Sequence, residues 1–149
     1  MEAVQKFGPN VVGFQLATGA RWWYIVGCYL APNDTLTIES VIAALKKRPM
    51  GDELLVAGDF NANLLEPEGD RRGEYIAAAM ATEGLEDMLA HFLLQRRSWC
   101  RDGRTRSMTR EGREVRSRTE YILGTDLRLF GNISVRDPRH NPYHYMVLV

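Results

Sequence analysis

The apolar residues near the start of the chain follow the pattern of β-strands. Residues 11–16 and 22–30 are rich in β-branched and aromatic side chains, and the glycine-containing loop between them has the length of a hairpin connection. We therefore expect an antiparallel strand pair. The second run is almost wholly apolar, which predicts a strand in the interior of a sheet, covered on both faces. Trp22 and Trp23 within it are typical of core and sheet-edge packing, the alternative being a base-stacking platform.

A helical period follows this strand pair. Apolar residues three and four positions apart over residues 38–45 predict a helix whose last turn holds cations that favour the helix dipole: Lys46, Lys47 and Arg48. Pro49 and Gly51 end that helix. A strand over residues 54–57, a helix over residues 74–82 that stops at Gly84, and an apolar stretch over residues 85–94 come next. Strand and helix alternate here, which predicts an α/β unit.

The last third of the chain is patterned as short β segments. Asp102 and Gly103 lie between two strand-like runs, 98–101 and 105–108, which is a strong hairpin signal. Further strands are predicted over residues 118–123, 133–135 and 145–149. Because the chain ends within a strand, it looks cut, and because it opens almost directly into a strand pair, no independent N-terminal unit is found. We expect residues 1–149 to form a single domain of the α/β (α+β) class, which the family resemblance described below implies is N-terminally truncated.

Charge is balanced overall but not along the chain. Nineteen basic and nineteen acidic residues cancel, so net charge alone gives no reason to expect nucleic acid. Residues 51–90, however, hold ten carboxylates against two arginines, whereas residues 96–118 hold nine arginines against three carboxylates. This asymmetry would suit a site that holds a cation in one place and grips phosphate in another, the alternative being solvated loops with no partner.

Length, cysteine usage and hydropathy limit the class of protein. A chain of 149 residues that is 45% hydrophobic and 26% charged is a globular domain rather than a disordered or fibrous chain. Cys28 and Cys100 have no second Cys or His at ligand spacing, so neither a zinc site nor a disulfide framework is predicted. No signal peptide or membrane-spanning run is found, and we expect an intracellular protein, nuclear or cytoplasmic, with no membrane partner.

The stretch from Gly58 to Asn63 is the strongest candidate for a functional site. It follows the apolar run 54–57 directly, so a carboxylate and two amides lie at a strand end. If the backbone stays extended, Asp59 and Asn61 point to the same face while Phe60 points to the core. A carboxylate there can orient or deprotonate a water or hold a divalent cation, and an amide can position a phosphate oxygen. The alternative is a structural turn.

Three other positions could supply partners to this strand end. Tyr29 ends a buried strand, and its hydroxyl could donate to an anion; the alternative is an amphipathic strand-end tyrosine. Glu120 interrupts an apolar run, and such carboxylates are usually paired. His144 precedes the terminal strand, where a lone histidine is more often a surface or satisfied core residue than a catalyst.

Four motifs in order resemble the later motifs of the endonuclease/exonuclease/phosphatase superfamily. They are Tyr29-Leu30-Ala31-Pro32-Asn33, Gly58-Asp59-Phe60-Asn61, Arg118-Thr119-Glu120-Tyr121-Ile122-Leu123 and Pro142-Tyr143-His144. Residues 99–105 and 116–126 are most similar to endonuclease domains of non-LTR (LINE-like) retrotransposons. The resemblance covers nearly the whole chain from about residue 12 onward.

This resemblance implies a divalent-metal phosphodiesterase on a DNase I-like fold, a two-layer β-sandwich flanked by helices. By this resemblance Tyr29 and Asn61 hold the scissile phosphate, and Asp59 activates or aligns the attacking water. The same resemblance makes His144 contact the phosphate and Glu120 orient that histidine. The cofactor would be Mg²⁺ or Mn²⁺, with metal ligands unknown, and the partner would be DNA. The candidate substrate-binding residues are Asn33, Asn63, Arg104 and Arg118.

The chain also departs from the family pattern. Tyr143 stands where the family has a metal-site Asp, and Glu120 replaces an Asp. The early Asn and metal-binding Glu motifs have no counterpart before Val12. We therefore expect weak or no catalysis from this chain alone, and a partner in the missing N-terminal lobe or another chain. The function predicted is a metal-dependent DNA endonuclease of retroelement origin; the alternatives are an inactive remnant, a nucleic-acid-binding module, or a phosphatase acting on a small phosphorylated substrate.

Overall fold

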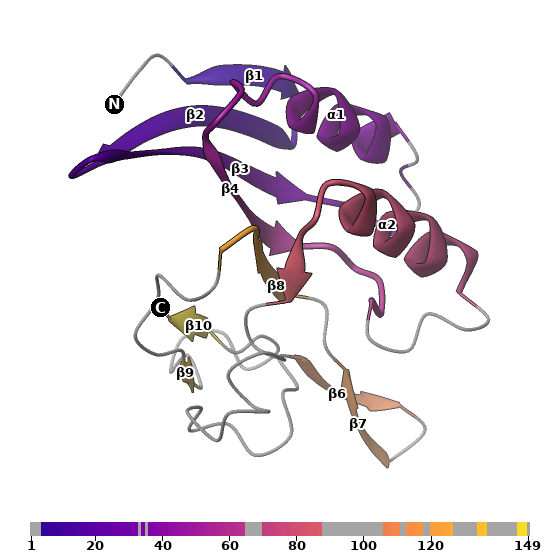
Figure 1. Cartoon of the computed structure of the whole chain (residues 1–149). Coiled ribbons are helices and arrows are strands. Elements are labelled where there is room, and N and C mark those ends of the chain that lie inside the picture. Colours follow the sequence, from indigo (N-terminus) through magenta and orange to yellow (C-terminus); the bar gives the residue numbers. More distant parts are fainter. Residues whose placement is uncertain are drawn as a thin grey trace.

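A six-stranded mixed sheet forms the centre of the computed structural model (Figure 1). The structure describes residues 4–32, 34, 36–64, 70–87, 106–110, 113–117, 120–126, 134–136 and 146–148. The elements in chain order are β1 (Gln5–Gly8), β2 (Val11–Thr18), β3 (Arg21–Tyr29), α1 (Leu36–Leu45), β4 (Glu53–Asp59), α2 (Arg71–Thr82), β5 (Glu86–Asp87), β6 (Arg106–Arg110), β7 (Arg113–Ser117), β8 (Glu120–Gly124), β9 (Ser134–Arg136) and β10 (Met146–Leu148).

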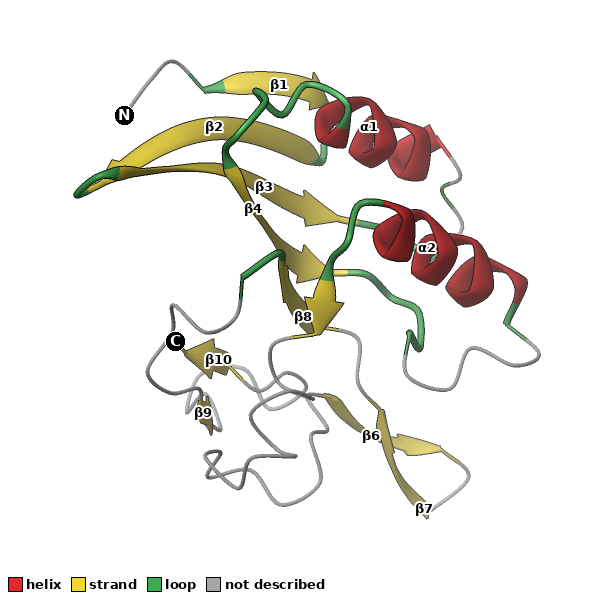
Figure 2. Ribbon diagram, in the orientation of Figure 1, coloured by secondary structure: helices red, strands yellow, loops and turns green. Residues whose placement is uncertain are grey.

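The strand order of the main sheet is β1-β2-β3-β4-β8-β5. Only β3 and β4 are parallel, and α1 makes the crossover between them, while the other neighbours in this sheet are antiparallel. Figure 2 shows both helices on one side of this sheet. The predicted α/β pattern is confirmed, and β3 lies in the interior of the sheet, as its apolar run indicated.

The predicted β2–β3 hairpin is tighter than its sequence suggested. Thr18 pairs with Arg21, so only Gly19 and Ala20 form the turn, and Gly19 has a φ of 61°, which glycine adopts without steric cost. Trp23 is buried, as expected, whereas Trp22 is 44% exposed. Strand β1 was not predicted.

Both predicted helices are present, with altered ends. Helix α1 ends at Leu45, so the three cations at positions 46–48 follow its last turn instead of lying in it. Helix α2 begins at Arg71, capped by Asp70, and ends before Gly84, whose φ is 69°. Among the residues that the structure describes, no helix is long and apolar enough to cross a membrane.

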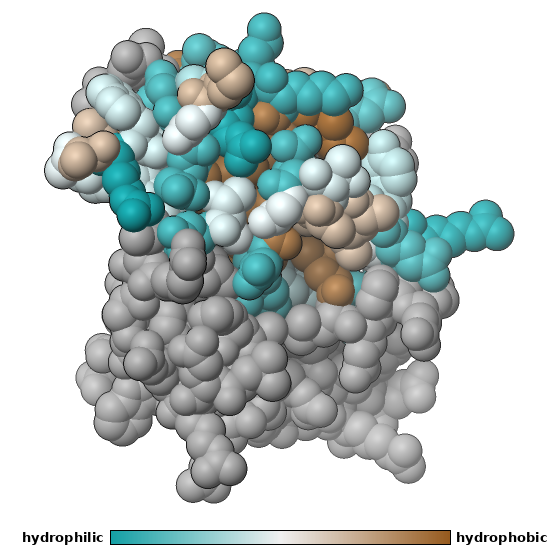
Figure 3. All heavy atoms as spheres, viewed as in Figure 1, coloured by the Kyte–Doolittle hydropathy of each residue, from teal (hydrophilic) through white to brown (hydrophobic). Residues whose placement is uncertain are grey.

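The core lies between the helices and the sheet. Side chains from α1 and α2 pack with alternate residues of β3, β4 and β8; the main ones are Val26, Ile38, Val41, Leu54, Val56, Ile76, Met80 and Leu123. On the face drawn in Figure 3, brown hydrophobic residues are visible between the hydrophilic side chains over the helices. This packing orders the strands that carry the motif residues.

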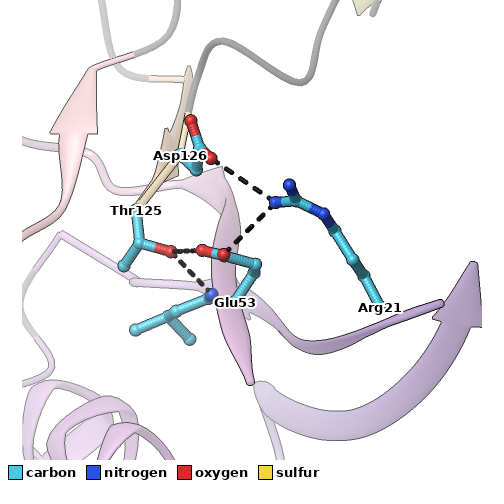
Figure 4. Close-up of polar contacts among 5 residues, drawn as sticks. Arg21, Glu53, Thr125 and Asp126 are labelled. Carbon is cyan, nitrogen blue, oxygen red and sulfur yellow. Dashed lines mark hydrogen bonds and ion pairs between the residues drawn. The ribbon is translucent and has the colours of Figure 1, made fainter. Parts of the chain in front are cut away.

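A polar network pins β8 to the start of β4 (Figure 4). The Thr125 hydroxyl accepts from the Leu54 amide at 2.9 Å and donates to Glu53 Oε2 at 2.8 Å. Arg21 lies 3.6 Å from Glu53 Oε1 and 3.5 Å from Asp126 Oδ2. Because the Arg21 side chain is half exposed, these ion pairs contribute less than about 1 kcal/mol, and the Thr125 bonds are the firmer link.

The later strands only partly match their predictions. Strands β8, β9 and β10 fall within or beside the predicted segments. Strand β6 pairs with β7, with Met108 opposite Val115, so residues 106–108 belong to a different hairpin from the one expected at Asp102-Gly103. Residues 98–105 lie outside the described part of the chain.

Gly58 is required by the close approach of β4 to β3. A Cβ built at Gly58 would lie 1.8 Å from the carbonyl oxygen of Cys28, a distance that no side chain can occupy. We expect Gly58→Ala to lower the free energy of unfolding by about 3 kcal/mol, since backbone must move to relieve the overlap. Urea denaturation of the two proteins measures this difference.

Gly27→Ala is the matched control on the neighbouring strand. A Cβ there would meet only Cγ2 of Val12, at 3.3 Å. We expect its unfolding free energy to stay within about 1 kcal/mol of the original, since a side chain can shift and the alanine restricts the unfolded chain. Equal losses in the two variants would contradict the close-approach explanation.

Candidate functional site

Three predicted site residues lie in one row across the sheet. In the β3–β4 pairing Tyr29 is opposite Asp59, and in the β4–β8 pairing Asp59 is opposite Glu120. Positions opposite one another on neighbouring strands have Cβ atoms roughly 5 Å apart. The pairing therefore brings the ends of β3 and β4 together with the start of β8, although these residues span about ninety positions of sequence.

Tyr29 and Asp59 belong to the sheet face that points away from the helices. Each comes one residue after a position in contact with the helix-side core, Cys28 on β3 and Gly58 on β4, and side chains alternate along a strand. Tyr29 is 48% exposed and Asp59 is partly exposed, so both can meet a solute.

Phe60 anchors the strand end in the core. It is fully buried and meets the buried ring of Tyr121 edge to face, with the ring centroids 5.6 Å apart. The Tyr121 hydroxyl accepts a hydrogen bond from the Leu64 amide at 2.9 Å. The prediction that Phe60 faces the core is confirmed, and this anchor fixes the chain on either side of Asn61.

Asn61 is not extended, contrary to our expectation. Strand β4 ends at Asp59, and Asn61 has a φ of 44°, in the left-handed region that asparagine tolerates better than most residues. The residue still lies beside Asp59, because its amide N–H donates to Asp59 Oδ1 at 2.9 Å. Its side-chain Nδ2 donates to the Leu30 carbonyl at 3.1 Å. A turn, rather than strand alternation, brings the Asp59 carboxylate to the backbone amide of Asn61, while the side-chain amide of Asn61 binds the segment after Tyr29.

The sequence did not indicate a site role for Arg72, which contacts the chain just beyond Tyr29. Its Nη1 donates to the Ala31 carbonyl at 2.7 Å and also to the Pro32 carbonyl. The Leu30 amide donates to the Asp59 carbonyl at 2.8 Å. Arg72 lies in an acidic stretch of sequence, in the loop predicted before the second helix, and no local pattern marks it as a partner of residues 31–32.

Asp34 continues this segment and begins α1. Its carboxylate accepts from the amides of Leu36 and Thr37, at 2.9 and 3.3 Å, and from the Thr37 hydroxyl. The hydrogen bond from the Thr37 hydroxyl, then those from the Thr37 and Leu36 amides, and last the Arg72 charge hold the pKa of Asp34 below its usual value. The segment after Tyr29 is therefore tied to both helices.

Cys28 lies beneath the row, on the helix side of β3. Burial, and then the nearby Asp59 carboxylate, raise the pKa of its thiol to about 12. The thiol is free and buried. A thiol with this pKa is protonated at neutral pH, which excludes Cys28 as a nucleophile in the folded chain.

The other predicted residues divide between described and undescribed parts of the chain. Asn63 follows the turn, and its carbonyl would lie 2.6 Å from a Cβ built at Gly73, so α2 packs tightly on this residue. For Glu120 only the backbone position is described, through its pairing with Asp59. Four predicted site residues, and the departure at Tyr143, lie outside the described residues: Asn33, Arg104, Arg118 and His144.

The described residues do not by themselves make a divalent-metal site. Among residues 4–87 and the later described strands, with their gaps, no three His, Cys, Asp or Glu side chains lie together. Asp59 supplies one carboxylate at the row, with Glu120 opposite it in register. Hard cations such as Mg²⁺ bind through several oxygen ligands, so the carboxylates of the described strands would hold such an ion only in part.

Solved structures match this chain, although no protein-family model and no curated protein does. An endonuclease/exonuclease/phosphatase family protein from Leptotrichia buccalis gives a TM-score of 0.63 at 13% identity, over 92% of this chain and 52% of that one. The endonuclease domain of TRAS1, a telomere-specific non-LTR retrotransposon, gives 0.68 at 23% identity, over 97% of this chain and 67% of that one. TDP2 from D. rerio, complexed with single-strand DNA product, gives a TM-score of 0.61 at 14% identity, over 97% of this chain and 64% of that one.

These likenesses establish the fold. The mixed α/β sheet with its two helices is the DNase I-like fold of endonuclease/exonuclease/phosphatase proteins, as the motifs predicted, and a retrotransposon endonuclease is among the structures it matches. The chain spans about half to two thirds of the length of these structures.

The Cys28 thiol gives a test of the local electrostatics. In a Cys100→Ser background, we expect Cys28 to react with a thiol reagent at neutral pH far more slowly in the folded than in the urea-unfolded chain, because only the thiolate is nucleophilic. Asp59→Asn should lower the pKa of the thiol but leave it above 9.0, the ordinary value, since burial is the larger cause.

The thiolate absorbance measured against pH gives this pKa directly. The neutral buried thiol contributes stability that is fully present below 9.0 and is lost as the pH rises toward about 12. A thiol pKa that is unchanged by Asp59→Asn would contradict the electrostatic contact between these two residues.

Proposed function

We propose that this chain is part of a phosphodiester-cleaving domain of the DNA endonuclease type, similar to those of non-LTR retrotransposons. The observation that carries the proposal is the row of Tyr29, Asp59 and Glu120 across β3, β4 and β8. The fold is one that nucleases and phosphodiesterases use, but fold alone does not determine chemistry, and the row supplies the local support.

Asp59 is the candidate group for handling the attacking water. It lies at a strand end, partly exposed, and its Oδ1 is oriented by the amide of Asn61. A carboxylate held in this way can accept a proton from a water or align it for attack on phosphorus. Tyr29, exposed on the adjacent strand, supplies a hydroxyl that can donate to a phosphate oxygen.

Asn61 has a second role in this proposal, besides the one implied by family resemblance. Its Nδ2 donates to the Leu30 carbonyl and its backbone N–H donates to Asp59 Oδ1. These contacts favour a role in holding Asp59 and the segment after Tyr29 in fixed positions. Contact of Asn61 and His144 with a phosphate stays a prediction from the resemblance.

The cofactor proposed is Mg²⁺ or Mn²⁺, which would polarise a phosphoryl oxygen and stabilise the negative charge that develops in the transition state. Asp59, partly exposed at the strand end, is a carboxylate that could hold it in part. Because the early metal-binding Glu motif of the resembled family has no counterpart before Val12, we expect this chain alone to be a weak catalyst.

A second candidate function is DNA binding without cleavage. Strands β6 and β7 form a hairpin that carries four arginines and one glutamate: Arg106, Arg110, Arg113, Glu114 and Arg116. Arg110 is opposite Arg113 in the pairing. A hairpin this rich in arginine has the composition of a segment that neutralises phosphate charge on a polyanion such as DNA.

Plasmid nicking tests the first proposal. With Mg²⁺ or Mn²⁺ and plasmid at several concentrations in excess of the protein, we expect slow conversion of supercoiled to open-circular plasmid, and Asp59→Asn should lower the rate by at least about a hundredfold, the usual contribution of a general base. The rate is measured by gel densitometry over a time course.

Asp52→Asn is the matched control, because it removes the same charge just before the other end of β4, where Asp52 accepts from Gln15 Nε2 at 2.7 Å. It should nick like the original chain. Equal nicking by the Asp59→Asn protein would overturn the role of Asp59. Release of inorganic phosphate from small phosphomonoesters without nicking would favour the phosphatase alternative.

The second candidate predicts salt-dependent binding through β6 and β7. The Arg110→Ala/Arg113→Ala double variant should bind duplex DNA more weakly, and its slope of log affinity against log salt should fall by roughly 0.9 for each phosphate that the variant no longer neutralises. Fluorescence anisotropy at several salt concentrations measures the slope.

Lys46→Ala/Lys47→Ala is the control, since it removes two positive charges that follow α1. It should leave the slope unchanged. An equal effect of the two double variants would indicate attraction by general charge and would remove the hairpin from the proposal.

A further inference from the structure

The segment after Tyr29 is held by side chains from two other elements. Three successive carbonyl oxygens accept from them: Leu30 O from Asn61 Nδ2 at 3.1 Å, and those of Ala31 and Pro32 from Arg72 Nη1, the former at 2.7 Å. Such carbonyls at the end of a strand usually face water or another backbone group. Here their hydrogen bonds fix the path of the chain directly beyond Tyr29.

Arg72 is itself held firmly at the start of α2. Its backbone amide donates to Asp70 Oδ1 at 3.1 Å in the helix cap. The next residue, Gly73, packs so closely on the Asn63 carbonyl that a Cβ would lie 2.6 Å from it. The guanidinium therefore starts from a fixed point and reaches the segment after Tyr29 with little freedom.

The guanidinium is not arranged to maximise stability. Nε and Nη2 are buried, and neither has a hydrogen-bond partner in the part of the chain that the structure describes. Buried donors of a charged group that lack acceptors cost free energy, and an apolar side chain of similar size avoids that cost. The Arg72 guanidinium bears this cost and still binds two carbonyl oxygens. Its contribution to packing therefore does not explain why an arginine occupies this position.

We infer that Arg72 is a positioning residue that sets Tyr29 against Asp59 by clamping the carbonyls of Ala31 and Pro32. The inference rests on the proposed function, because Tyr29 and Asp59 are the groups proposed to meet the phosphate. Leu30 connects the clamped segment to Asp59, because its amide donates to the Asp59 carbonyl at 2.8 Å. A shift of the segment after Tyr29 would therefore displace both Tyr29 and Asp59. Misplacement of a reacting group by about 1 Å can cost about a hundredfold in rate.

Arg72→Met separates positioning from stability. Methionine keeps an unbranched apolar stem in the same space but removes the charge and all its donors. We expect the urea midpoint of unfolding to stay close to that of the original chain. Hydrogen exchange at the Leu30 amide should become at least about tenfold faster, while the amides of β2 and β3 keep their protection. In the nicking assay kcat should fall by at least about tenfold with KM little changed.

Arg71→Met is the control, since it removes the same charge from the neighbouring, exposed position. It should change neither the exchange of the Leu30 amide nor kcat. Arg72→Lys should restore these quantities at least in part, because one nitrogen of Arg72 makes both bonds and an ammonium group can also donate to two carbonyls. No restoration by lysine would overturn the inference.

Two further results would overturn it. One is unchanged exchange at Leu30 in the Arg72→Met protein; the other is faster exchange at all core amides together with a lower urea midpoint, which would make Arg72 a general stabiliser. If the original chain nicks no DNA, the proposed function fails, but the exchange experiment still decides whether Arg72 fixes the segment after Tyr29.

Discussion

The pairing of β4 with two unlike neighbours is the constraint on which the rest of the structure depends. Strand β4 runs parallel to β3 on one side and antiparallel to β8 on the other. A slip of one residue in either pairing would turn alternate side chains to the wrong face and separate Tyr29, Asp59 and Glu120. Two features oppose such a slip: the Thr125 bonds at one end of β4 and the contact of Gly58 with Cys28 near the other.

The two faces of the sheet differ in what they contact. The face toward α1 and α2 is closed by aliphatic side chains and by the Phe60–Tyr121 contact, and it supplies the rigidity. The opposite face carries Tyr29 and Asp59 at the strand ends, partly exposed. Residues at strand ends are held in fixed positions by the hydrogen bonds of the sheet. The segment beyond Tyr29 is held by side-chain hydrogen bonds from Asn61 and Arg72.

Sequence patterns predicted the local structure well where neighbouring residues decide it. The apolar run of β4, the glycine of the β2–β3 turn and the end of α2 at Gly84 follow from local chemistry. The conformation of Asn61 and the contacts of Arg72 do not follow from local chemistry, because both residues bind carbonyls about thirty or forty residues away. Strand β1 was missed because Gln5-Lys6-Phe7-Gly8 lacks an alternating apolar pattern, and its place comes from pairing with β2.

The structural tasks inside the motif Gly58-Asp59-Phe60-Asn61 bear on how such sequences evolve. Gly58 lets two strands approach, Phe60 fills the core, and Asn61 takes a left-handed turn and bonds to Leu30. Selection for folding alone is enough to retain these three residues. Retention of the motif is therefore evidence of the fold, whereas retention of the partly exposed Asp59 would need selection for something other than folding.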